Sequence, residues 1–80
     1  MPYILPNKRN QLPETAGELN YSLTKMVHEY IVNKGGINYS NINEVIGVLE
    51  CAKQELYRVL AAPYEDEKKN ENGHVSELDE

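Results

Sequence analysis

The sequence predicts an all-α protein, an antiparallel helical hairpin of two long helices assembled as a homo-oligomer. An extended N-terminal segment precedes the hairpin and a flexible acidic C-terminal tail follows it. Three observations predict this fold. Apolar residues from Ile42 to Val59 recur at alternating spacings of three and four, which places them on one helix face. A second apolar stripe runs from Leu19 to Ile31. The connection between the stripes is short, which favours antiparallel neighbours.

The chain has room for one domain. We expect a helical domain over residues 1–63, with helices at about 16–34 and 41–61, and an acidic, disordered tail over residues 64–80. Residues 1–63 carry equal numbers of acidic and basic side chains, so the net charge of −5 lies entirely in residues 64–80. That segment has few apolar side chains and cannot bury enough surface to order itself.

Local signals set the expected bounds of the first helix. Prolines flank Tyr3, Ile4 and Leu5, so this segment is expected to be extended. Thr15 and Glu18 have the spacing of a capping box, which predicts the start of the helix. Lys34-Gly35-Gly36 predicts its end, because a glycine just past a helix takes the left-handed conformation without steric cost.

The second helix has two possible caps and one expected stop. Ser40 or Asn41 can cap its first turn, and Glu44 lies at the capping-box distance from Asn41. Pro63 is expected to end the helix at about Ala61, because the residue before a proline is biased away from helical angles.

This helix is apolar on more sides than one neighbour can cover, and a chain of 80 residues has little else to bury it. Self-association or a partner is therefore expected. Gly47 lies in mid-helix, where glycine costs about 1 kcal/mol relative to alanine. It could allow close approach of a second helix, hold a flat ligand, or simply be tolerated. The candidate residues of the oligomer interface are Tyr3, Ile4, Ile46, Gly47, Val48 and Cys51.

Polar residues of the second helix form a candidate ligand site. Glu50, Lys53, Gln54 and Tyr57 fall along one face, with Arg58 at its margin. The same pattern of polar residues is also common on a solvent-exposed helix face that binds no ligand. Six tyrosines, without phenylalanine or tryptophan, suit interfaces and nucleobase pockets as well as simple packing. The candidate ligand-binding residues are Tyr39, Asn43, Lys53, Tyr57, Arg58 and Tyr64.

The sequence contains no catalytic signature. His28 and His74 lack the spacing of zinc ligands, and no residue near Cys51 marks it as a nucleophile, so we place Cys51 in the core or an interface. We expect no enzyme activity, no cofactor and no metal. The absence of clustered cations argues against binding to duplex nucleic acid. No apolar run approaches the length of a membrane span. A single cysteine and no signal peptide favour the cytoplasm.

The chain resembles a family of small proteins of unknown function found in phages, prophages and bacteria. The resemblance covers most of the chain and supplies no catalytic residues. Two positions depart from the pattern: Leu56, where an aromatic residue is common, and His74, where an acid often follows Asn-Gly. The matching segments are Tyr3–Pro6, Gly17–Tyr21, Ile42–Glu50 with Lys53, Glu55, Tyr57 and Arg58, Ala62–Asp66 and Asn72-Gly73.

This resemblance implies a protein that acts by stoichiometric binding in the cytoplasm, the host cytoplasm if it is phage-encoded. Its expected partners are itself and a host protein or small signalling nucleotide. The first hypothesis is a homo-oligomeric helical binding protein that modulates a host process, including interference with defence. The alternative is a sponge that sequesters cyclic or adenine-type nucleotides between subunits, with Asn43, Lys53 and Arg58 on phosphate or ribose. A third hypothesis is a phage structural or assembly factor.

Overall fold

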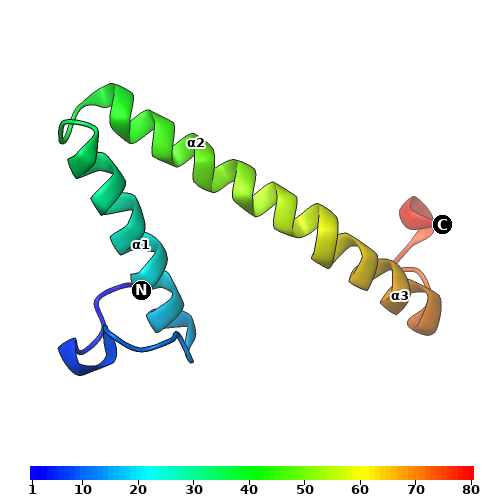
Figure 1. Ribbon diagram of the computed structural model, residues 1–80. Coiled ribbons are helices and arrows are strands. Elements are labelled where there is room, and N and C mark those ends of the chain that lie inside the picture. The colour runs from blue at the N-terminus through cyan, green and yellow to red at the C-terminus, as the bar shows by residue number, and fades with distance from the viewer. The chain divides into compact units, whose positions relative to one another are not determined.

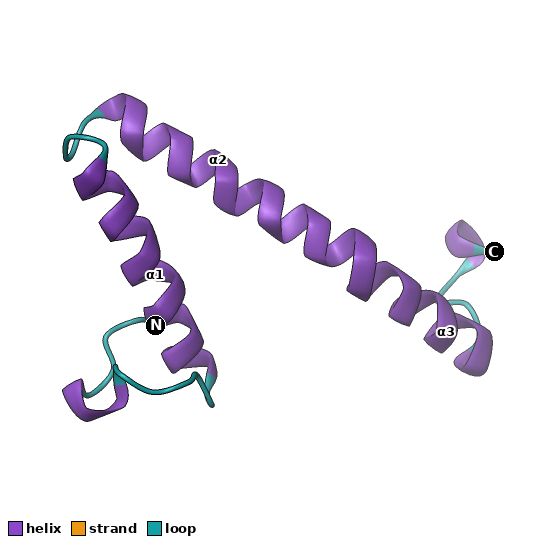
Figure 2. Ribbon diagram, viewed as in Figure 1, coloured by secondary structure: helices purple, strands orange, loops and turns teal.

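A computed structural model describes all residues from 1 to 80, and every regular element in it is helical (Figure 2). This confirms the prediction of an all-helical fold with two long helices. A π-helical turn joins the second long helix to a shorter third one, and two short 3-10 turns lie near the chain ends. The elements are Pro6–Lys8 (3-10), α1 (Ala16–Asn33), α2 (Tyr39–Leu56), Tyr57–Ala61 (π), α3 (Ala62–Asn72) and Glu77–Asp79 (3-10).

The contacts of the chain divide it into two units, Met1–Val45 and Ile46–Glu80. Figure 1 shows the course of the chain through α1, α2 and α3. The first unit contains the N-terminal segment, α1, the turn after α1 and the beginning of α2. The second contains the remainder of α2, the π-helical turn and α3. The boundary falls inside α2, so each candidate residue of this helix belongs to one unit or the other.

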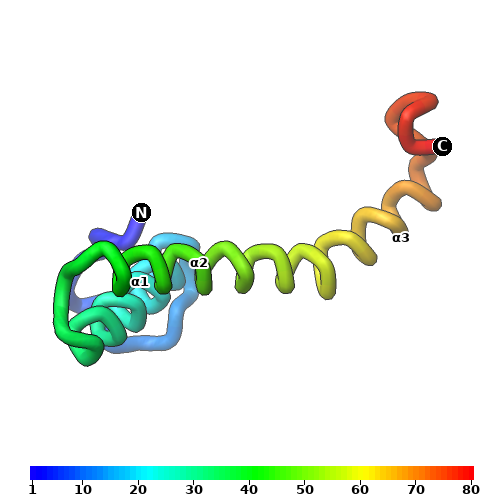
Figure 3. Tube along the Cα trace, turned by 90° about the horizontal axis from the view of Figure 1, so that it is seen from above, coloured from blue at the N-terminus to red at the C-terminus, as the bar shows by residue number.

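The N-terminal segment folds back onto the first turn of α1 (Figure 3). A Cβ atom at Gly17 would lie 3.3 Å from Cγ2 of Ile4 and 3.3 Å from the carbonyl oxygen of Met1. Glycine is therefore the residue that allows this close approach. Residues 1–5 form no helix, and the first 3-10 turn begins only at Pro6.

The first turn of α1 is capped by Thr15, as the sequence predicts. The Thr15 hydroxyl accepts a 3.2 Å hydrogen bond from the Glu18 N–H. The Glu18 carboxylate does not return this bond to the Thr15 N–H. It accepts instead from the Glu14 N–H at 3.3 Å, the Thr15 hydroxyl at 3.1 Å and the Gln11 amide at 2.8 Å. Glu18 is buried, and these donors replace the water that it loses.

Two glycines end α1 as expected. Gly35 and Gly36 have φ values of +106° and +100°. The Gly36 N–H donates to the Ile31 carbonyl at 2.9 Å, and the Gly35 N–H donates to the Val32 carbonyl at 3.2 Å. This pair of bonds is the Schellman motif, which satisfies carbonyl groups left open at the helix end.

Asn38, rather than Ser40 or Asn41, caps α2, so the predicted cap is wrong. The Asn38 side-chain oxygen accepts a 2.8 Å hydrogen bond from the Asn41 N–H, and α2 begins at Tyr39. The Asn41 side chain is needed elsewhere. It is buried, and its amide donates to the Gly36 carbonyl at 2.9 Å and to the Lys34 carbonyl at 3.2 Å. Asn41 therefore holds the turn closed while Asn38 starts the helix.

Pro63 does not stop the helical backbone, contrary to our expectation of an end at Ala61. The Ala62 N–H donates to the Tyr57 carbonyl, five residues back, and α3 then continues to Asn72. A proline ring clashes with the carbonyl four residues earlier in a regular α-helix. The π-helical turn Tyr57–Ala61 lies just before the proline, and its wider backbone gives the ring more room than a regular α-helix does. The expected boundary at residue 63 thus falls inside a continuous helical path (Figure 3).

The chain buries almost none of its apolar side chains. Val45 is the only buried hydrophobic residue. Leu23 of the α1 stripe is 48% exposed, and Leu56 of the α2 stripe is 60% exposed. Each stripe is thus left largely uncovered by the other residues of its own unit. The remaining exposed members of the stripes are Leu19, Met26, Tyr30, Ile42, Leu49, Ala52 and Val59.

Candidate functional site

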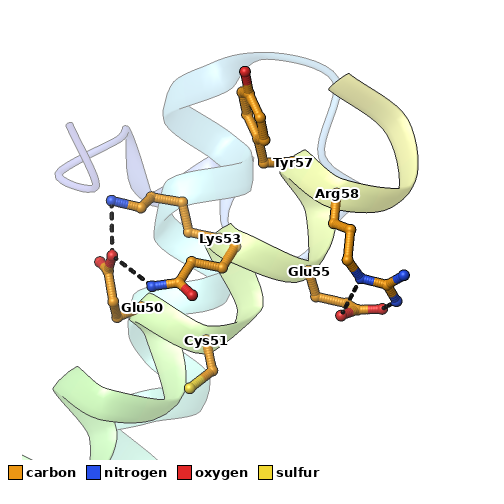
Figure 4. Close-up of a pocket in the computed structure, with 7 residues that line it drawn as sticks. Glu50, Cys51, Lys53, Glu55, Tyr57 and Arg58 are labelled. Atoms are coloured by element: carbon orange, nitrogen blue, oxygen red, sulfur yellow. Dashed lines mark hydrogen bonds and ion pairs between the residues drawn. The ribbon is translucent and has the colours of Figure 1, made fainter. Parts of the chain in front are cut away.

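The second unit presents a shallow concave face on the last turns of α2 and the π-helical turn (Figure 4). Three of the six candidate ligand-binding residues, Lys53, Tyr57 and Arg58, lie here. One helical stretch supplies the whole face, because its members recur at spacings of three and four. The lining residues are Glu50, Cys51, Lys53, Gln54, Glu55, Tyr57 and Arg58.

Both cations of this face are paired with carboxylates of the same helix. The Lys53 ammonium lies 3.1 Å from the Glu50 carboxylate, and the Arg58 guanidinium lies 2.6 Å from that of Glu55. The hydrogen bond from Lys53 and a second one from Gln54 lower the pKa of Glu50. Such exposed pairs add little stability, but they leave the face with no net charge. An anionic ligand that approached either cation would meet the carboxylate paired with it.

Two tyrosine side chains of the second unit, one of them on this face, are also engaged within the chain. The Tyr57 hydroxyl donates a 2.6 Å hydrogen bond to the Glu65 carboxylate, and this bond raises the pKa of Tyr57. The Lys68 ammonium lies 5.5 Å from the centre of the Tyr64 ring, a cation–π distance. The rings remain open to stacking, whereas the Tyr57 hydroxyl already has a partner.

The other two candidate ligand residues belong to the first unit. Tyr39 and Asn43 lie in the first turns of α2, before the boundary at Val45, and both are exposed. They do not line the concave face of the second unit. The six candidates are therefore divided between the two units rather than gathered in one site of the chain.

The candidate interface residues have different environments. Ile46 and Val48 of α2 are exposed, and no atom lies within 4 Å of a Cβ built at Gly47. Cys51, which we placed in the core or an interface, is an exposed free thiol on the polar face. Ile4 is partly covered and lies against Gly17.

Tyr3, the last interface candidate, is 79% exposed. Of the two N-terminal candidates, Ile4 is thus committed to packing within the chain, and Tyr3 is open to a ligand or another chain.

Comparison with known families identifies the family to which the chain belongs. Residues 1–75 match the family model described as "Domain of unknown function (DUF6899)". The chain belongs to the DUF6899 family. No curated protein and no solved structure matches it. The resemblance to a family of unknown function is thereby confirmed, and the distribution of that family in phages and prophages stays a prediction.

The sequence reasoning did not include the exposed apolar stripe of α2 among the candidate interface residues of the DUF6899 chain. It assigned the α2 stripe to an internal seam and sought the interface in the residues beside it. Leu49, Leu56, Val59 and Leu60 are between 44% and 61% exposed, so the stripe itself is available to a partner. The regular spacing of three and four was the signal that could have identified it.

A second concave surface of the DUF6899 chain lies in its first unit, between the N-terminal segment and α1, and the sequence reasoning missed it as well. Tyr21, Thr24, Lys25 and His28 share one face of α1 by their spacing of three and four. The complete lining consists of Pro2, Tyr3, Arg9, Tyr21, Thr24, Lys25 and His28.

Two further observations concern metal ligands and membrane spans in this DUF6899 chain. No three side chains of the His, Cys, Asp or Glu type are grouped so that they could hold a metal ion. None of the helices has the length and apolar character required to cross a membrane.

Proposed function

We propose that the protein is a small, non-catalytic, homo-oligomeric helical protein of phage or prophage type that modulates a host process by stoichiometric binding. Interference with host defence is included in this proposal. The observation that carries it is the exposure of the apolar stripe on α2, in a chain whose single buried hydrophobic residue is Val45. A large exposed apolar patch on a small protein normally marks an interaction surface.

The α2 surface is suited to pairing with its own copy. Ile46, Leu49, Leu56 and Leu60 lie on one broad side of the helix, and no residue of the second unit is buried. A two-fold axis would bring the same patch together from both chains. Antiparallel pairing also separates the acidic α3 segments of the two copies, whereas parallel pairing would place like charges side by side.

Oligomer mass, measured by light scattering and native mass spectrometry, tests the assembly. We expect the wild-type chain to be an oligomer, and Leu56→Asp to weaken it at least tenfold, because a carboxylate would be buried in the stripe. Gln54→Asp is the matched control. It adds the same charge to the same helix, on the polar face, and should leave the mass unchanged.

Two results would contradict this assembly. One is a wild-type chain that is monomeric throughout the measured concentration range. The other is an equal loss of mass in Leu56→Asp and Gln54→Asp, which would indicate a general effect of charge. An open-ended series of masses, in contrast to one closed oligomer, would favour the structural or assembly factor.

Stoichiometric binding requires a second measurement. Native mass spectrometry of the protein purified from a host cell should show a partner chain in fixed ratio to the subunits. An oligomer that carries only the excess mass of a small molecule would favour the nucleotide sponge instead. Lys53 and Arg58 are already paired with carboxylates, so the α2 face has no net charge. This neutrality counts against a nucleotide sponge that uses these two residues.

A further inference from the structure

The cleft between the N-terminal segment and α1 combines cations and aromatic rings without a carboxylate. Arg9, Lys25 and His28 supply the basic groups, and Tyr3 and Tyr21 supply the rings. No aspartate or glutamate lines it. The concave face on α2, in contrast, includes Glu50 and Glu55. The N-terminal cleft is thus the more favourable environment for an anion.

The two permanent cations of the cleft have no acidic partner. Neither Arg9 nor Lys25 takes part in an ion pair, and both side chains are exposed. Lys53 and Arg58 on α2 each lie within 3.1 Å of a carboxylate oxygen. An anion that entered the N-terminal cleft would meet unpaired charges and would displace no protein group.

Arg9 is held in position by contacts that leave most of its donors free. Its Nε atom donates to the Ile4 carbonyl oxygen at 3.1 Å. Its guanidinium carbon lies 5.2 Å from the centre of the Tyr21 ring, a cation–π distance. Neither contact uses the terminal nitrogen atoms of the guanidinium group. Those two nitrogens have the fork geometry that recognises phosphate oxygens.

The tyrosines add a surface for a planar ring. Tyr3 is 79% exposed, and its hydroxyl makes no hydrogen bond within the chain. An aromatic ring on the edge of a basic cleft is the arrangement that stacks nucleobases in single-stranded nucleic-acid sites. Such a ring selects for a ligand that has a planar group beside its anionic group.

We propose that this cleft binds a small phosphate monoester that carries a planar ring, a mononucleotide in chemical class. Arg9 and Lys25 contact the phosphate, and the exposed Tyr3 ring stacks on the base. The cleft volume of about 230 Å³ is below the roughly 300–1,000 Å³ of pockets that bury drug-sized ligands. This size favours one base with one phosphate over a dinucleotide. The site lies within one unit and does not depend on the proposed oligomer.

Three probes test the phosphate contacts and the ring contact separately. They are adenosine 5′-monophosphate (AMP), which has both groups, inorganic phosphate and adenosine. Titrations of the full chain would be followed by calorimetry and by chemical shifts of the α1 amides. AMP should bind more tightly than either of the other two, because only AMP engages both the cations and the ring. Its affinity should fall as salt is raised, since the contacts are exposed and screened.

Two variants test the assigned roles. Lys25→Gln should weaken AMP and phosphate by about tenfold each, the usual cost of losing a charge-assisted hydrogen bond. Tyr3→Ala should weaken AMP and leave phosphate unchanged. The matched control is Lys34→Gln, which removes one positive charge from the same unit outside the cleft and should not alter AMP binding.

The oligomer mass of each variant, measured in parallel, must equal that of the wild type. A binding loss then cannot be attributed to failed assembly, and the two proposals fail or stand separately.

Several outcomes would overturn the proposal. AMP that binds no more tightly than inorganic phosphate would remove the role of the ring. Equal losses in Lys25→Gln and Lys34→Gln would reduce the binding to unspecific charge attraction. A synthetic peptide of residues 64–80 that bound more tightly than AMP would assign the cleft to an acidic protein segment of another copy.

Discussion

The Tyr57 hydroxyl donates a 2.6 Å hydrogen bond to the Glu65 carboxylate across the π-helical turn that joins α2 to α3. The two residues are eight positions apart, on either side of Pro63. Their bond connects the helix before the proline with the helix after it. It also occupies the hydroxyl group that a ligand on this face would otherwise use.

We expect Tyr57→Phe to increase amide hydrogen exchange in the first turns of α3, because the link across the turn is lost. Tyr64→Phe is the matched control, since the Tyr64 hydroxyl makes no hydrogen bond within the chain and its ring remains beside Lys68. Equal exchange in both variants would show that the Tyr57 bond does not hold α3.

The same bond should be sensitive to alkaline pH. The hydrogen bond to Glu65, with the negative charge of that carboxylate, raises the pKa of Tyr57 above its ordinary value of 10.0. A raised pKa favours the neutral hydroxyl in the folded chain, so its contribution is complete below pH 10 and is lost as the pH rises through the folded value. Protection of α3 in the wild type should therefore fall above pH 10 to that of Tyr57→Phe.

Glu18 should make the first unit sensitive to acid. The hydrogen bond from the Gln11 amide lowers the pKa of Glu18 below its ordinary value of 4.5. Hydrogen bonds from the Glu14 N–H and the Thr15 hydroxyl lower this pKa further. A lowered pKa means that the contribution of the carboxylate is complete above pH 4.5 and is lost as the pH falls through the folded value. The free energy of unfolding should therefore decrease in that window, as followed by circular dichroism.

Glu18→Gln is expected to remove this acid dependence and to lower stability at neutral pH, because an amide cannot accept all three bonds. Glu14→Gln changes a side chain that makes no hydrogen bond and should retain the acid dependence. A wild-type chain whose stability is constant between pH 5 and pH 3 would contradict the assigned role of Glu18.

The ends of α1 were predictable because their signals are local. A capping hydroxyl at Thr15 and the glycines after Lys34 act within one or two turns of backbone, so residue type and spacing determine the result. The start of α2 was misjudged by two residues. Asn38 and Asn41 are both good caps, and only the carbonyl groups left open by the preceding turn decide which one is free.

The site was predictable only in part. Spacing alone placed Lys53, Tyr57 and Arg58 on one face, and the structure groups them there. It could not show that each has a carboxylate partner. The N-terminal cleft joins Arg9 to Tyr21 and Lys25 across residues that are not periodic. Such a site depends on how an irregular segment folds back, which no helical pattern encodes.

Asn41 should be the most sensitive polar residue of the turn. It is buried, and its side-chain amide donates to two backbone carbonyl groups. Asn41→Ala would leave both carbonyls without that donor, at a cost of about 1–3 kcal/mol in unfolding free energy. Asn43→Ala is the matched control, two residues along α2 and exposed, and should change stability by less than about 0.5 kcal/mol. Urea unfolding of both variants decides between them.

Gly17 and Gly47 should respond in opposite ways to alanine. Both lie in helices, but a Cβ at Gly17 would lie 3.3 Å from two atoms of the N-terminal segment, whereas one at Gly47 meets nothing within 4 Å. Gly47→Ala should therefore raise the unfolding free energy of the chain by about 1 kcal/mol, through helix propensity alone. Gly17→Ala should lower it and shift the amide signals of residues 1–5, because that segment must move.

The mass of the Gly47→Ala oligomer gives this comparison its second use. If Gly47→Ala keeps the oligomer mass of the wild type and its unfolding free energy does not fall, no second helix approaches closely at Gly47. The α2 stripe alone then carries the assembly. If the variant dissociates, the methyl group has blocked a close contact with another chain. Glycine at position 47 would then be explained by the oligomer, because nothing within the single chain requires it.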